Sequence, residues 1–155
     1  MRTAYRVLAY VICGLVAIQA ASHAWASAGF IAFLAEGGSI DMSGASGPPP
    51  FPEFMGVIIH GMNGMYVIPL VALALLGVAF AAKIPGGAVR AGIVLGLVVL
   101  QVALGLLGHS MTALTFLHGL NALVLFAAAL IAGLMVSRSN LGARVDAGEP
   151  VRTVR

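Results

Sequence analysis

Three long stretches of this sequence contain no charged residue, and they constrain its fold more than any other feature. They lie between Arg6 and Glu36, between Glu53 and Lys83, and between Arg90 and Arg138. A helix that crosses a bilayer needs about 20 apolar residues, with a range of roughly 17–25. The third stretch is too long for one crossing. We expect it to fold back at its polar interruption, Gly108-His109-Ser110-Met111-Thr112.

The overall composition leads to the same fold class. Hydrophobic residues make up 61% of the chain, against roughly 45–50% in soluble domains, and charged residues only 8%, against roughly 25%. We therefore predict an all-α protein, a transmembrane four-helix up-down bundle that occupies residues 1–137. Its spans are expected near residues 7–30, 54–80, 91–108 and 113–136.

Charges flanking the predicted spans indicate the orientation. One side carries the basic residues, namely Arg2, Arg6, Lys83, Arg90, Arg138, Arg144, Arg152 and Arg155. The other side carries Glu36, Asp41 and Glu53 without any Lys or Arg. By the positive-inside rule, both termini are expected in the cytoplasm, with the protein in the cell inner (plasma) membrane. The basic charge is thus explained without nucleic acid. The expected partners are the lipid bilayer and a second copy or a larger membrane complex.

Proline and glycine mark the irregular parts of the chain. Residues 35–53 are expected to form an external loop, because Pro48-Pro49-Pro50 favours an extended conformation and Gly37-Gly38 breaks helices. Pro69 is expected to kink the second span. Residues 138–155 are expected to be a disordered, basic cytoplasmic tail.

The first span has an alternative interpretation as a secretory signal peptide. Its apolar core from Val7 to Ala21 is followed by Ala24-Trp25-Ala26, which resembles a cleavage site. Cleavage would leave three spans. The apolar run continues from Gly29 to Leu34, however, and this favours an uncleaved helix.

A histidine motif occurs twice in the predicted spans. His60-Gly61-Met62-Asn63 returns as His118-Gly119-Leu120-Asn121, each copy just inside the start of a span. In the preceding spans, Ile18-Gln19-Ala20-Ala21 is matched by Leu100-Gln101-Val102-Ala103. Two matches in the same order predict two similar helical hairpins. The two glutamines are interpreted as packing or as polar contacts between helices.

The repeated histidines are expected to meet inside the bundle. The second and fourth helices of an up-down bundle are diagonal neighbours. If these helices begin near Phe54 and Thr112, His60 and His118 each lie about 9 Å deep at 1.5 Å per residue. Ionisable residues within a membrane are candidates for functional sites. Diagonal histidines at one depth suit the two axial positions of a haem iron.

The other candidate site residues adjoin these histidines. They are Gly61, Gly64, Gly119, Asn63 and Asn121. The glycines are expected to leave room for a porphyrin, and the asparagines to hydrogen-bond the ligand or each other. His23 and His109 are expected to form the other diagonal near the external interface. Contact with interfacial water would explain both of them without a ligand.

Two segments carry a resemblance to known proteins, Gln101-Val102-Ala103-Leu104-Gly105 and Leu117-His118-Gly119-Leu120-Asn121-Ala122-Leu123-Val124-Leu125-Phe126. With them the chain resembles a small, uncharacterised family of four-helix bacterial integral membrane proteins. It is similar, more distantly and over roughly residues 54–136, to half of haem A synthase. In that synthase, histidines on alternate helices ligate haem, which implies His60 and His118 as axial ligands here. Gly61 stands where the synthase pattern often has arginine, so synthase activity is not expected.

The leading functional prediction is a haem-binding, b-type cytochrome-like membrane protein. It would hold haem b between His60 and His118 near the external face and act in electron transfer or as an accessory subunit, without catalytic activity of its own. The alternative is a non-enzymatic structural or assembly subunit with no cofactor. A third possibility is the handling of copper or another metal, because thioether and imidazole ligands suit copper. The external methionines are Met42, Met55, Met62, Met65 and Met111.

Overall fold

The computed structural model describes residues 1–40 and 48–146, with side chains as far as residue 136. The helical elements are, in order, α1 (Arg2–Ala35), the 3-10 turn η1 (Pro52–Phe54), α2 (Met55–Met62), the π-helix η2 (Asn63–Val67), α3 (Ile68–Ala82), α4 (Gly87–Gly108) and α5 (Thr112–Asp146). No strand occurs in these described ranges. The prediction of an all-α chain is confirmed.

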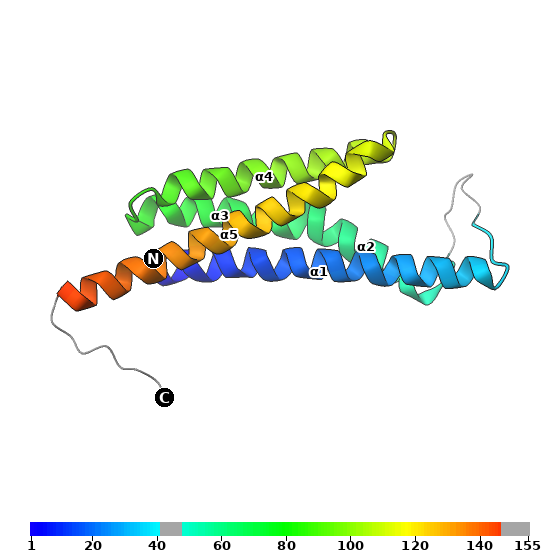
Figure 1. Cartoon of the computed structure of the whole chain (residues 1–155), viewed down its shortest axis with the longest axis horizontal. Coiled ribbons are helices and arrows are strands. Elements are labelled where there is room, and N and C mark those ends of the chain that lie inside the picture. Colours follow the sequence, from blue (N-terminus) through cyan, green and yellow to red (C-terminus); the bar gives the residue numbers. More distant parts are fainter. Residues whose placement is uncertain (41–47, 147–155) are drawn as a thin grey trace, which may run out of the picture.

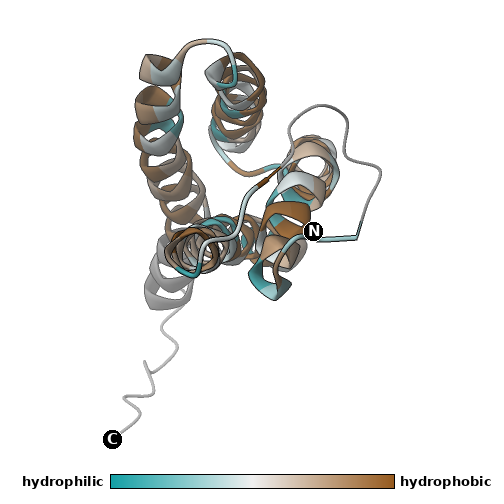
Figure 2. Ribbon diagram, turned by 90° about the vertical axis from the view of Figure 1, so that its right-hand side faces the viewer, coloured by the Kyte–Doolittle hydropathy of each residue, from teal (hydrophilic) through white to brown (hydrophobic). Residues whose placement is uncertain are grey.

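Within the part of the chain that the structure describes, four helical stretches are long and apolar enough to cross a membrane. They are α1, the combined stretch Pro52–Ala82, α4, and α5 as far as Val136, with mean hydropathies from 1.8 to 2.4. Figure 2 shows apolar ribbon along every one of the helices. The protein is a multi-pass membrane protein, as its uncharged stretches predict.

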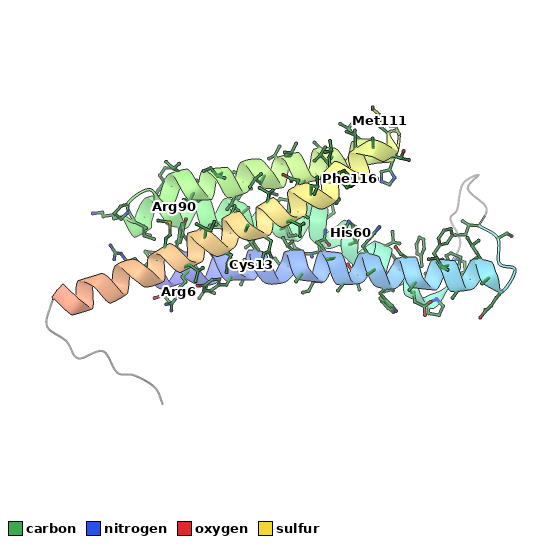
Figure 3. All side chains as sticks on the ribbon, viewed as in Figure 1. Arg6, Cys13, His60, Arg90, Met111 and Phe116 are labelled. Carbon is green, nitrogen blue, oxygen red and sulfur yellow. The ribbon has the colours of Figure 1, made fainter. Side chains whose placement is uncertain are left out.

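The helices pack in the order of an up-down bundle. Helix α1 lies against α2, α3 and α5, and α4 lies against α3 and α5 (Figure 1). The diagonal pairs are therefore α1 with α4, and the second span with α5. At one end, the Tyr5 hydroxyl donates a hydrogen bond of 3.0 Å to the Gly87 carbonyl, which joins the starts of α1 and α4. Arg6 and Arg90 lie at this same end (Figure 3).

An apolar core fills the half of the bundle next to this end. Its buried members are Tyr5, Ala9, Ile12, Cys13, Val16, Ile68, Ala72, Leu75, Ala79, Ala82, Ile84, Ala91, Val94, Val98, Leu125, Ala129, Ala132 and Val136. Alanines at the helix contacts let the backbones approach closely, which is how membrane helices gain packing energy. Toward the other end, this core stops at Val16 on α1 and at Val98 on α4, and on α5 it starts only at Leu125. A layer of polar side chains follows, and it holds the candidate site.

The second span changes its winding in the middle. The turn Asn63–Val67 is a π-helix, between α-helical segments. Pro69 has no N–H, and its ring would clash with the carbonyl of Met65 in an α-helical turn. The wider π turn relieves this clash, and such turns often occur at functional sites. Beyond it, α2 packs against α1 and makes no extensive contact with the described parts of α4 or α5.

The helices extend further than the sequence suggests. Helix α1 runs through Ala24-Trp25-Ala26 without a break. Helix α5 continues to Asp146, so residues 138–146 are helical, contrary to the predicted disordered tail. Once a helix has been nucleated and packed, each further residue costs little to add. Residues 147–155, and residues 41–47 of the predicted loop, lie outside the described residues.

Candidate functional site

Two matching sets of polar side chains lie at the outer edge of the core. Each set takes one glutamine from the first helix of a hairpin, and one histidine and one asparagine from the second. The first set is Gln19, His60 and Asn63, and the second is Gln101, His118 and Asn121. The predicted sequence repeat thus occupies equivalent places in the two hairpins.

Each histidine is held by the backbone of the glutamine in its set. Nδ1 of His60 lies 3.1 Å from the Gln19 carbonyl oxygen, and Nδ1 of His118 lies 3.0 Å from that of Gln101. A carbonyl only accepts, so the neutral rings carry their proton on Nδ1 and keep the lone pair on Nε2. Among the described residues, Nε2 has no hydrogen-bond partner in either ring. Metal-ligating histidines commonly have this arrangement, with the second ring nitrogen bound to a carbonyl or carboxylate.

In the first hairpin, Asn63 fixes the glutamine side chain. Its Nδ2 donates to the Leu15 carbonyl at 3.1 Å and to Gln19 Oε1 at 3.2 Å. The Asn63 side chain is 7% exposed, and its Oδ1 is a buried acceptor without a donor among the described residues. Such an acceptor costs roughly 1–3 kcal/mol when it stays unpaired. This oxygen therefore marks unused hydrogen-bonding capacity beside His60.

The second hairpin repeats these contacts. Asn121 Nδ2 donates to the Leu97 carbonyl at 3.0 Å and to Gln101 Oε1 at 2.6 Å. Gln101 Nε2 also donates to the His118 carbonyl at 3.0 Å. Each asparagine therefore donates a hydrogen bond to the glutamine of its own hairpin. The alternative, a hydrogen bond between the two asparagines, does not occur in the structure. The hydrogen bonds of each polar set lie within one hairpin.

His60 and His118 come together across the diagonal of the bundle. Their ring centroids are 6.0 Å apart, with 51° between the ring planes. An imidazole nitrogen lies about 2.0–2.1 Å from a metal that it binds, and the centre of the ring lies roughly 1 Å further from the metal. Two imidazoles that bind one ion from opposite sides therefore have ring centres about 6 Å apart. Figure 3 places His60 between Cys13 and the Met111 end of the bundle, well away from Arg90.

His23, on α1, lies beside His60, and His109 ends α4, the helix diagonal to α1. The ring centroids of His23 and His60 are 5.1 Å apart, because α1 and α2 are direct neighbours. His109 is exposed at the end of α4. Although three histidines gather here, the described residues hold no group of three or more His, Cys, Asp or Glu arranged to bind a metal ion.

Of the three glycines expected at the site, Gly64 is the one whose Cβ position adjoins another side chain. A Cβ at Gly61 or Gly119 would meet no atom within 4 Å, so neither glycine borders a neighbouring helix. A Cβ at Gly64 would lie 2.5 Å from Gln19 Nε2, so this glycine makes room for the glutamine and not for a porphyrin. A Cβ at Gly105 would lie 3.1 Å from Cε1 of His118. Gly105, which the sequence reasoning does not select, is therefore the glycine that adjoins a candidate ligand.

The external methionines that the structure describes lie on the outer surface of the bundle. The side chains of Met55, Met62, Met65 and Met111 are between 40% and 59% exposed on the outer surface of the bundle. Met42 lies outside the described residues. In a membrane, exposed methionines of this kind contact lipid chains.

Comparisons of this chain with protein-family models, with curated proteins and with solved structures find no match.

Proposed function

We propose that this chain is an integral membrane haem-binding protein of b-type cytochrome character, in which His60 and His118 bind the iron from opposite faces. The observation that carries the proposal is the 6.0 Å separation of two rings whose Nδ1 atoms are both anchored to carbonyls. Haem b in this place would supply one-electron transfer. The protein would then act as an electron carrier or as an accessory subunit of a redox complex, and it needs no catalytic residue of its own.

Anchoring of the two rings supports ligation in a further way. A hydrogen bond from Nδ1–H to a carbonyl fixes the tautomer and the ring orientation, and it raises the basicity of Nε2. In the second set, Gln101 binds both the ring and the backbone carbonyl of His118. Such positioning fixes the ring and leaves Nε2 without a hydrogen-bond partner among the described residues. It is what an axial ligand needs.

A tetrapyrrole held by His60 and His118 would lie between the two hairpins. The polar sets join α1 to the second span and α4 to α5, and none of the hydrogen bonds in them links one hairpin to the other. The apolar core ends below this level, and α2 has little contact with α4 or α5. Haem can therefore separate the hairpins at their outer half without breaking a hydrogen bond of either set. We also propose that this architecture is built like half of haem A synthase.

The distribution of charge supports an orientation for the proposed site. Arg6, Lys83 and Arg90 belong to the end with the buried Tyr5–Gly87 bond, and Glu36 and Glu53 belong to the opposite end. By the positive-inside rule, both termini then lie in the cytoplasm and the haem lies in the external half of the inner membrane.

Haem stoichiometry tests the proposal. The protein, purified in detergent from cells supplied with ample haem, is expected to contain about one haem b per chain, measured as the pyridine haemochrome against total protein.

The second candidate function is a structural or assembly subunit without a cofactor. It is favoured by the hydrogen bonds of each polar set, all of which lie within one hairpin and need no ligand. A colourless protein from the same preparation would contradict haem binding and leave this second function.

The replacement Gly105→Val tests the contact between Gly105 and the His118 ring. The added side chain would begin at a Cβ only 3.1 Å from Cε1 and 3.2 Å from Nδ1 of His118, so the ring has to move. We expect haem retention to fall roughly tenfold, the size of effect seen when the support of a metal ligand is disturbed. Gly92→Val on the same helix is the control, because a Cβ there meets nothing within 4 Å. Equal retention by the two variants would show that Gly105 has no part in positioning His118.

A further inference from the structure

A small apolar pocket lies at the outer end of the first hairpin. Its volume is about 170 Å³, and its walls are formed by α1, by the start of the second span, and by Ile40 and Phe51 of the connection between them. The lining residues used below are His23, Ser27, Phe30, Phe51, Phe54 and Val57. Pockets that enclose drug-sized molecules have roughly 300–1,000 Å³. This pocket therefore suits a single-ring head group and is too small for a tetrapyrrole.

Aromatic side chains give the pocket a defined shape. The ring of Phe51, which is only 7% exposed, lies 6.2 Å from Phe30, 5.4 Å from Phe33 and 5.8 Å from Phe54 between centroids. Aromatic rings at such distances pack favourably with each other and with a further planar ring. The cluster also fixes the chain where it re-enters the bundle before η1.

The polar groups of the pocket are few and lie on one helix. His23 and Ser27 are one turn apart on α1, and they supply an imidazole and a hydroxyl to an otherwise apolar lining. The His23 ring also contacts that of His60, at 5.1 Å. In the second hairpin, the position one turn after Gln101 is Gly105, so His23 has no counterpart there. The histidine of the pocket is thus specific to the first hairpin.

We propose that this pocket binds the head group of an isoprenoid quinone. The planar ring lies against Phe30 and Phe54, a ring oxygen hydrogen-bonds the His23 imidazole, and the isoprenoid chain extends into the bilayer. A lipid acyl chain would fill the apolar part but would make no use of His23 or Ser27. The bound head group lies one imidazole away from His60. Binding itself needs no haem, so the site can be tested separately from the proposed function.

Trp25, the one tryptophan of the chain, provides the readout. It is close to His23 in sequence on α1 and is 47% exposed. Haem-free protein, purified from haem-depleted cells, is titrated with a ubiquinone analogue that carries a decyl side chain. We expect saturable quenching of Trp25 fluorescence and, in His23→Ala, an affinity lower by about tenfold, the effect of one lost hydrogen bond to a ligand. His23→Gln, which keeps a donor, is expected to recover part of the loss.

His109→Ala is the matched control, because His109 is an exposed histidine at the same end of the other hairpin. It is expected to bind the analogue like the unmodified protein. Quenching that rises linearly with added quinone, or that is equal in His23→Ala, would overturn the proposal. Equal competition by a decyl chain without a head group would do the same, and would assign the pocket to lipid.

Discussion

His118→Ala is expected to lower haem retention by about tenfold or more and to remove the low-spin spectrum of an iron with two imidazole ligands. The side chain it removes is one of the two anchored rings, and its Nε2 is the atom assigned to iron. Loss of the group that supports a metal ligand typically costs 10–100-fold in affinity, so loss of the ligand itself costs at least as much. The change is measured by absorption spectroscopy of the oxidised and reduced protein. Imidazole added to the variant is expected to restore the low-spin bands.

Two further variants make this result specific. His60→Ala is expected to behave like His118→Ala, because the two rings have equivalent anchors. His109→Ala is expected to keep the full spectrum, since its side chain is exposed beyond the site. An unchanged low-spin spectrum in His118→Ala would show that the iron is held elsewhere.

Leu75→Ala is expected to destabilise the bundle by about 2–5 kcal/mol, the range for a leucine removed from a packed core. Leu75 is fully buried in α3 among the core residues. Because lipid chains are as apolar as leucine, lost packing and not the hydrophobic effect accounts for most of this cost, which favours the lower part of the range. The free energy is measured by reversible unfolding in mixed detergent. The folded fraction is expected to keep its haem spectrum, since the core and the site are separate layers.

Leu73→Ala is the control for this change. Leu73 is on the same helix but is 52% exposed, so its truncation removes contacts with lipid instead of with other helices. We expect a cost well below that of Leu75→Ala. Equal costs would mean that the described core does not hold the helices together.

Much of the fold follows from the sequence because the bilayer restricts the choice. Uncharged stretches of sufficient length form helices in lipid, since every backbone polar group has to be paired within the segment. The encounter of His60 with His118 also follows, because equal depth on diagonal helices leaves the two side chains few other places. The predicted repeat has a structural counterpart as well, as both copies of the motif make the same hydrogen bonds.

The parts that the sequence does not reveal depend on local contacts. The polar contacts predicted for Gln19 and Gln101 are present, because both side chains accept hydrogen bonds from asparagines on the next helix. The sequence does not reveal that the backbone carbonyls of the same two glutamines orient the candidate ligands. Sequence spacing cannot tell which ring nitrogen meets a carbonyl on another helix. The π turn at Asn63–Val67 is likewise not expected from the sequence, since a proline specifies a disturbance but not the form it takes.

Partners of single side chains are equally hard to derive. His23 meets His60 because α1 and α2 stay together where the second span leaves α4 and α5. A regular four-helix bundle would not have this divergence. The role of Gly64 also depends on it, because the Gln19 amide reaches that glycine across the α1 contact.

The most direct test of the central claim is electron paramagnetic resonance of the oxidised protein. If His60 and His118 bind one iron, the spectrum contains the low-spin signal of a bis-imidazole haem, equivalent to about one iron per chain. Each single alanine variant then converts the remaining haem to a high-spin signal. A low-spin signal that survives in both variants, or the absence of any haem signal from protein prepared with ample haem, would contradict the account.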